Sequence, residues 1–94
     1  MAKLKLGMIY TSAGVASMAE EDKGFAHFVQ TSIGRYYECD WGETAEEECL
    51  MNDAAVENGD DRIIAVYRYH SDLVIWIITE CDRSATTILF PYEY

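Results

Sequence analysis

A chain of 94 residues and 10.7 kDa has the size of one compact domain, and we expect a single domain over residues 1–94. Half of the residues are hydrophobic, a fraction that excludes an intrinsically disordered chain. The longest unbroken aliphatic and aromatic run covers residues 73–78, whereas a membrane-spanning helix needs about 20 residues. The N-terminal residues contain no apolar stretch long enough for a secretory signal. The composition therefore predicts a soluble, cytoplasmic protein without a membrane partner.

The negative charge is confined to one part of the chain. Seventeen acidic and seven basic residues give a net charge of −10, and ten of the acids lie between Glu38 and Asp61, where there is no Lys or Arg. The rest of the chain is electrically neutral. Because nucleic-acid affinity comes largely from Lys and Arg, this distribution argues against direct binding to DNA or RNA. The acidic segment is either a solvated, solubilising helix face, a docking surface for a basic protein partner, or a decoy that imitates nucleic acid.

The first half of the chain predicts a strand followed by two helices. Alternating apolar residues indicate a strand over about residues 3–10. Ser12 is a suitable N-cap for a helix near 13–22, and Gly24 is expected to end that helix in a left-handed cap. Apolar residues at three- and four-residue spacing then predict a second helix over about 25–36.

A third helix is predicted over residues 44–58. Thr44 and Glu47 match the capping box, in which each side chain satisfies the backbone amide of the other residue, and Gly59 is a suitable stop. Acids in the first turn favour the positive end of the helix dipole.

The last third of the chain alternates with a period of two and predicts an antiparallel meander. Its strands are expected over residues 62–70, 74–79 and 84–90, with two short polar turns between them. The middle strand is apolar on both faces and is therefore placed centrally. The order β-α-α-α-β-β-β predicts an α+β fold, in which two to three helices pack on an antiparallel sheet of three to four strands.

The cysteines give no sign of a metal site. Cys39, Cys49 and Cys81 form no Cys-x-x-Cys pair, and neither His27 nor His70 stands in a ligand pattern beside them. We therefore expect reduced thiols, no bound metal and no cofactor.

Several short motifs are shared with a known group of proteins. They are Asp40-Trp41-Gly42-Glu43, Asn52-Asp53, Ala65-x-Tyr67, Trp76-Ile-Ile-Thr-Glu80, Asp82-Arg-Ser-x-Thr-Thr-Ile-Leu89 and Pro91-x-Glu93-Tyr94. With them the chain resembles a family of small uncharacterised proteins from plasmids, conjugative transposons and phages of Gram-positive bacteria. It departs from the family pattern at residues 35–39 and at Cys81. The resemblance implies a mobile-element setting and no established activity, so no catalytic residue is carried over.

Two clusters of polar residues are candidate sites. Glu80, Asp82 and Arg83 gather at a predicted hairpin turn, where they could bind a metal or perform acid–base chemistry. In the structural alternative Asp82 accepts amides of its own turn and Arg83 pairs with Glu80 or Asp82. The second cluster is Asp40-Trp41-Gly42: Trp41 is either an exposed interface anchor or a side chain packed onto the sheet.

Asn52 and Asp53 are poor helix formers in the middle of the third helix. We expect one of them to hydrogen-bond buried loop backbone near Trp41 and the other to face water.

Together these features favour a non-catalytic protein-interaction module that docks through its acidic segment. The candidate interaction residues are Asp40, Trp41, Glu43, Glu46, Glu47, Asn52, Asp53, Glu80, Asp82 and Arg83. The alternative is a small metal-dependent hydrolase that uses Glu80, Asp82 and Asp40. A third possibility is a homo-oligomer formed through an edge strand.

Overall fold

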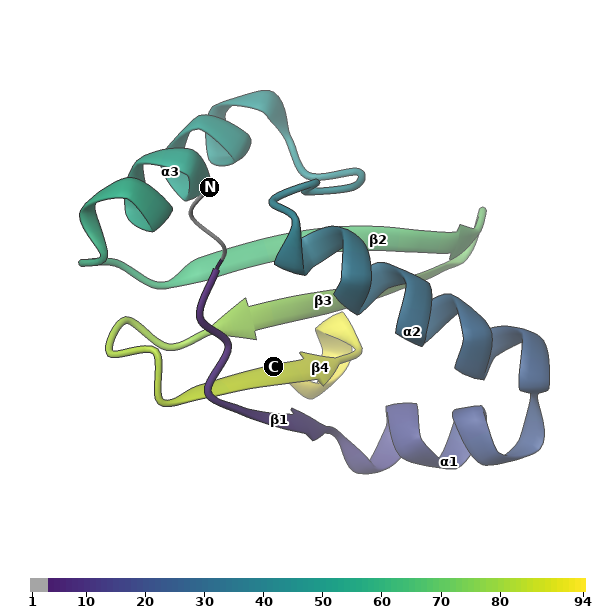
Figure 1. Ribbon diagram of the computed structural model, residues 1–94. Helices are drawn as coiled ribbons and strands as arrows, with labels where there is room; N and C mark the ends of the chain where they lie inside the picture. The colour runs from purple at the N-terminus through teal and green to yellow at the C-terminus, as the bar shows by residue number, and fades with distance from the viewer. Residues whose placement is uncertain (1–3) are drawn as a thin grey trace.

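The computed structural model describes residues 4–94 and has the predicted α+β order (Figure 1). The elements are β1 (Met8–Thr11), α1 (Ala13–Glu21), α2 (Lys23–Tyr37), α3 (Glu46–Asn58), β2 (Ile63–His70), β3 (Leu73–Thr79), β4 (Ala85–Leu89) and the 3₁₀ turn η1 (Pro91–Glu93). In the described part of the chain no helix is long and apolar enough to cross a membrane.

The four strands form one mixed sheet in the order β1-β4-β3-β2. The predicted meander of the last three strands is confirmed, because β2 pairs antiparallel with β3 and β3 pairs antiparallel with β4. The middle strand, β3, is central as predicted. β1 adds to the other side of β4 in parallel, with Met8 opposite Ala85. β1 and β2 are therefore the two edge strands.

The hydrophobic core lies on the sheet face that α2 covers. The stripe of α2 that faces inward contains Phe25, Val29, Ser32 and Tyr36, all buried. Alternate residues of β2 are buried against it, since successive side chains of a strand point to opposite faces. The Tyr36 hydroxyl lies 2.6 Å from the Thr79 hydroxyl and donates to the Ile63 carbonyl, so the core satisfies its polar groups internally.

The predicted first strand is shorter than expected. Residue 3, at which the prediction started, lies outside the described residues, and β1 itself begins only at Met8. Gly7 interrupts the extended chain with a φ of 65°, and a Cβ there would lie 2.4 Å from the Ser84 carbonyl oxygen. The chain therefore turns at Gly7, where it passes the β3–β4 connection.

The two N-terminal helices follow the prediction except at their junction. Ser12 caps α1 as predicted, and its hydroxyl accepts from the Val15 amide. The predicted left-handed cap at Gly24 is wrong, because Gly24 lies inside α2. Asp22 makes the junction instead: it ends α1, and its carboxylate accepts from the Phe25 amide as the N-cap of α2.

The predicted capping box of the third helix is also wrong. α3 begins at Glu46, after Ala45, which supplies no side-chain cap. Thr44 lies before the helix and turns its hydroxyl to other partners, described below. At the other end the prediction is confirmed, because Gly59 ends the helix with a φ of 69°.

Candidate functional site

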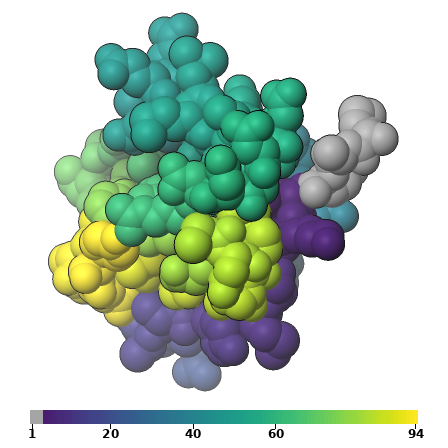
Figure 2. Space-filling view, turned by 90° about the vertical axis from the view of Figure 1, so that its left-hand side faces the viewer, coloured from purple at the N-terminus to yellow at the C-terminus, as the bar shows by residue number. Residues whose placement is uncertain are grey.

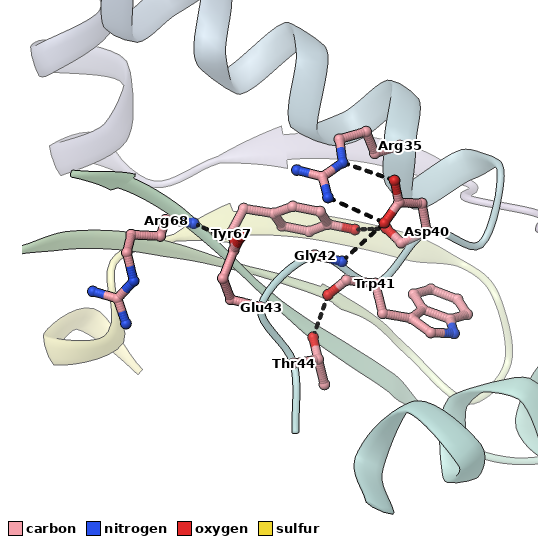
Figure 3. A network of polar contacts seen from close by, with 8 residues as sticks. All are labelled: Arg35, Asp40, Trp41, Gly42, Glu43, Thr44, Tyr67 and Arg68. Carbon is pink, nitrogen blue, oxygen red and sulfur yellow. Dashed lines mark hydrogen bonds and ion pairs between the residues drawn. The ribbon is translucent and has the colours of Figure 1, made fainter. Parts of the chain in front are cut away.

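The loop between α2 and α3 is fixed by Asp40 (Figure 3). The Arg35 guanidinium donates to both carboxylate oxygens of Asp40, at 2.9 and 3.1 Å, and the Gly42 amide donates to the same carboxylate at 3.2 Å. The Tyr67 hydroxyl, from β2, donates to the Asp40 carbonyl at 2.7 Å. The hydrogen bond from Arg35 lowers the pKa of the Asp40 carboxyl below its usual value. Asp40 therefore holds the loop in place.

Gly42 brings this loop against β2. It forms an isolated parallel bridge with Val66 and has a φ of 65°. A Cβ at this position would lie 2.6 Å from both the Val66 carbonyl oxygen and the Tyr67 ring. The close approach of the two backbones therefore requires glycine.

The same loop and α3 together cover the outer edge of β2 with four hydrogen bonds. The Glu43 amide donates to the Val66 carbonyl at 2.8 Å, and the Glu43 carboxylate accepts from the Arg68 amide at 2.9 Å. The Thr44 hydroxyl accepts from the Val66 amide at 2.9 Å and donates to the Trp41 carbonyl. The Asn52 side chain donates to the Ile64 carbonyl at 2.9 Å. Three side chains and one backbone amide thus occupy the edge groups of β2 that a neighbouring strand occupies elsewhere in the sheet.

Trp41 is part of the core and not an exposed anchor. Only 5% of its surface is exposed, and its ring meets the Tyr36 ring edge-on at 5.5 Å. Its indole N–H donates to the Asp53 carboxylate at 2.8 Å. The expectation for the two polar residues of α3 is thus half right. Asn52 is buried and bonds strand backbone instead of loop backbone, and Asp53 binds Trp41 although it is exposed.

The turn between β3 and β4 is held by Asp82 and Arg83. The Asp82 carboxylate accepts from the Ser84 amide at 2.9 Å, as the structural alternative predicted. The predicted pairing of Arg83 with the carboxylate of Glu80 or Asp82 is wrong: its guanidinium donates to backbone carbonyls, including those of Asp61 at 2.6 Å and Ala55 at 2.8 Å. The negative end of the α3 dipole attracts a cation, so Arg83 joins the turn to the last turn of α3 and to the segment that follows it.

The carboxylates of the hydrolase hypothesis are not gathered in one place. Asp40 lies in the loop that bridges β2 at Val66, whereas Glu80 follows Thr79, which is paired with Ile63. Ile63 and Val66 are three positions apart on β2, a distance of roughly 10 Å along the strand. Among residues 4–94 no group of three or more His, Cys, Asp or Glu side chains is placed to hold a metal ion. This geometry gives the hydrolase hypothesis no support.

Unlike the carboxylates of the hydrolase hypothesis, the acidic residues at the start of α3 are neighbours on one exposed helix. Glu46, Glu47 and Glu48 are exposed in the first turn of the helix, and beside them Leu50 and Met51 are each 64% exposed. We call these five side chains the α3 surface. In Figure 2 the green α3 projects above the yellow C-terminal residues and the yellow-green β3–β4 turn. Charged and apolar side chains therefore adjoin on one projecting helix.

A groove of about 520 Å³ lies next to the α3 surface, on the sheet face opposite the core. Its lining comprises Glu48, Met51, Asn52, Asp61, Arg62, Ile64, Val66, Trp76 and Tyr94. The apolar part of the lining comes from the outward-facing residues of β2 and β3. The Tyr94 hydroxyl accepts from Arg62 at 2.7 Å, and the Tyr94 ring packs edge-on against Trp76 at 5.6 Å. The C-terminal residue thus forms one wall of the groove.

Of the residues that line the groove, only Asn52 was predicted from the sequence as a candidate interaction residue. The strand alternation placed Ile64, Val66 and Trp76 on one face of the sheet, and that was the available signal. That α3 and Tyr94 flank this face depends on contacts between distant segments.

Comparison with known proteins found no matching family model, no matching curated protein and no matching solved structure.

Proposed function

We propose that this protein is a non-catalytic interaction module that binds a basic, amphipathic segment of a partner protein through the α3 surface and the adjoining groove. The observation that carries the proposal is the juxtaposition of three exposed carboxylates with an apolar groove of about 520 Å³. An acidic helix face alone would be explained by solubility. An acidic face beside an unfilled apolar surface is typical of a docking site.

The negative charge of the acidic segment favours a basic partner. Ten acids and no bases occur between Glu38 and Asp61, so the local potential attracts Lys and Arg and repels acidic chains. Four acids of this segment, Asp40, Glu43, Asp53 and Asp61, already accept hydrogen bonds within the protein. Among the other acids, Glu46, Glu47 and Glu48 are exposed in the first turn of α3, where Glu48 lines the groove, so these three are the candidates for contact with a partner.

The groove supplies the apolar part of the interaction. A leucine or phenylalanine that moves from water onto Val66 and Trp76 gains roughly 1.5–3 kcal/mol. Exposed ion pairs contribute less, roughly 0.2–1 kcal/mol each, but they orient the partner and speed its association. The partner that fits is a helix with an apolar stripe and flanking lysines or arginines.

The resemblance to mobile-element proteins adds a more specific form of the proposal. Basic helices are common in DNA-binding proteins, so the acidic surface would occupy such a helix in place of nucleic acid. Under this form, duplex DNA competes with the protein for its partner.

The test uses a fluorescein-labelled amphipathic peptide of about 16 residues, with leucines on one face and lysines on the other. Fluorescence anisotropy at about 0.15 M salt should give a dissociation constant in the micromolar range. Substitution of Glu46, Glu47 and Glu48 by Gln removes three ion pairs of about 0.5 kcal/mol each and should weaken binding roughly tenfold.

The matched control makes the same change in net charge elsewhere. Glu20, Glu21 and Asp72 are exposed and lie outside the acidic segment, and their replacement by Gln, Gln and Asn should leave the affinity within about twofold. Equal weakening by both triple variants would mean that overall charge, and not this surface, attracts the peptide. No binding to the wild-type protein at about 200 µM peptide would refute the proposal.

A further inference from the structure

The two edge strands of the sheet, β1 and β2, differ in how far other parts of the chain cover their outer sides. Four hydrogen bonds from residues 43–52 cover the outer edge of β2. β1 is bonded on one side only: the Met8 amide donates to the Ser84 carbonyl at 3.1 Å, and the Ser12 amide donates to the Ile88 carbonyl at 2.9 Å. Of the elements within residues 4–94, none pairs with the outer side of β1, which is the end strand of the sheet in Figure 1.

Backbone alternation identifies the groups on the open edge. Because the amides of Met8 and Ser12 face β4, the N–H and C=O groups of Ile9 and Thr11 point away from the sheet. Within residues 4–94 these groups have no hydrogen-bond partner in the folded chain. Met8, Ile9 and Tyr10 are also 63%, 52% and 52% exposed, so apolar side chains border the open edge. An exposed apolar edge of this kind pairs readily with another strand.

The charge distribution favours a second copy of the same chain as the occupant. The acidic segment packs against β2, three strand spacings from β1, which is about 14 Å. If two copies join through β1, their β2 strands lie seven spacings apart, about 34 Å. The Debye length at physiological salt is about 8 Å, so repulsion between the two acidic segments is screened. The part of the chain outside the acidic segment has no net charge.

We propose that β1 pairs antiparallel with β1 of a second copy around a two-fold axis at Tyr10. In this register Ile9 lies opposite Thr11 of the second copy, and Thr11 lies opposite Ile9 of the second copy. All the outward N–H and C=O groups of these two residues are then used, in four hydrogen bonds, and the two sheets join into one of eight strands. The α3 surfaces lie at opposite ends of this dimer, which makes the assembly bivalent.

The first test is the mass in solution. Light scattering on a size-exclusion column at about 0.2 mM protein should give about 21 kDa, twice the mass of one chain. Ile9→Lys places a charge at the pairing edge and should raise the dimer dissociation constant at least about tenfold. In the control variant, Leu50→Lys, lysine also replaces an exposed apolar residue, but this residue lies on α3, and the dimer should stay intact.

A second measurement does not depend on the folding of a variant. Hydrogen exchange of the Ile9 and Thr11 amides in the wild-type protein should slow as the protein concentration rises, because these amides become bonded in the dimer. A wild-type mass of about 11 kDa at 0.2 mM, a dimer that survives Ile9→Lys, or exchange at Ile9 and Thr11 that is independent of concentration would each overturn the proposal. The peptide test of the α3 surface is unaffected by any of these results.

Discussion

The replacement of Thr44 by Val tests whether the loop before α3 is held by the edge of β2. Valine keeps the shape of threonine and removes its hydroxyl, which accepts from the Val66 amide and donates to the Trp41 carbonyl. Thr44 is only 9% exposed, so water cannot easily replace the hydroxyl. The Trp41 carbonyl still accepts from the backbone amide of residue 44, so the Val66 amide is the group left without a partner. An unsatisfied backbone group of this kind costs roughly 1–3 kcal/mol, which for a domain of this size lowers Tm by roughly 5–20 °C.

Urea unfolding followed by circular dichroism measures the loss, and Thr31→Val is the matched control. Thr31 is exposed on α2, so its replacement should change the free energy of unfolding by less than about 0.5 kcal/mol. If Thr44→Val is no more destabilising than Thr31→Val, the hydroxyl does not join the loop to β2 and the account of this edge is wrong.

Two further predictions concern glycines and a buried phenol. Gly42→Ala should destabilise the protein by roughly 2–4 kcal/mol, because Gly42 has a positive φ and lies against Val66. Gly34→Ala, in the last turn of α2 where a Cβ meets open space, should stabilise it by about 0.5–1 kcal/mol, and thermal unfolding that shifts both variants the same way would contradict this. Burial raises the pKa of Tyr36 above its ordinary value near 10, so the unfolded phenol ionises first and the free energy of unfolding falls above about pH 10. Urea unfolding between pH 8 and 11 should show a weaker pH dependence for Tyr36→Phe, and an unchanged slope would refute the assignment.

Local signals in the sequence were sufficient for the elements that depend on local chemistry. The Ser12 cap, the stop at Gly59 and the meander of β2, β3 and β4 all follow from residues within a few positions of one another. The buried stripe of α2 follows from its own periodicity.

Two of the errors occurred where a side chain bonds a distant partner instead of a local one. Thr44 matches the capping box, but the unpaired Val66 amide at the sheet edge takes its hydroxyl. Arg83 has two carboxylates nearby in sequence, yet it donates to the carbonyls of Ala55 in the last turn of α3 and of Asp61 just beyond it, 28 and 22 residues earlier. A sequence pattern cannot decide between such partners, because the competing group is brought close only by the fold.

The candidate docking surface consists of acidic residues and a groove, and only the acidic residues could be predicted from the sequence. The excess of acids at Glu46, Glu47 and Glu48 is visible in the sequence, and the structure leaves them exposed. The groove depends on the position of Tyr94 against Trp76, which are 18 residues apart and on different elements. The sequence also offered Trp41 as an interface anchor, but its burial against Tyr36 removes it from the surface.

The most direct test of the docking surface is an NMR titration of the ¹⁵N-labelled protein with the basic amphipathic peptide. The chain has two tryptophans and therefore two indole N–H signals. The Trp76 signal should move because this ring lines the groove, whereas the Trp41 signal should stay in place because its N–H is held by Asp53. Backbone shifts should concentrate on Glu46–Asn58 and the outward face of β2. Shifts confined to α1 and α2, with the Trp76 signal unmoved, would contradict the account.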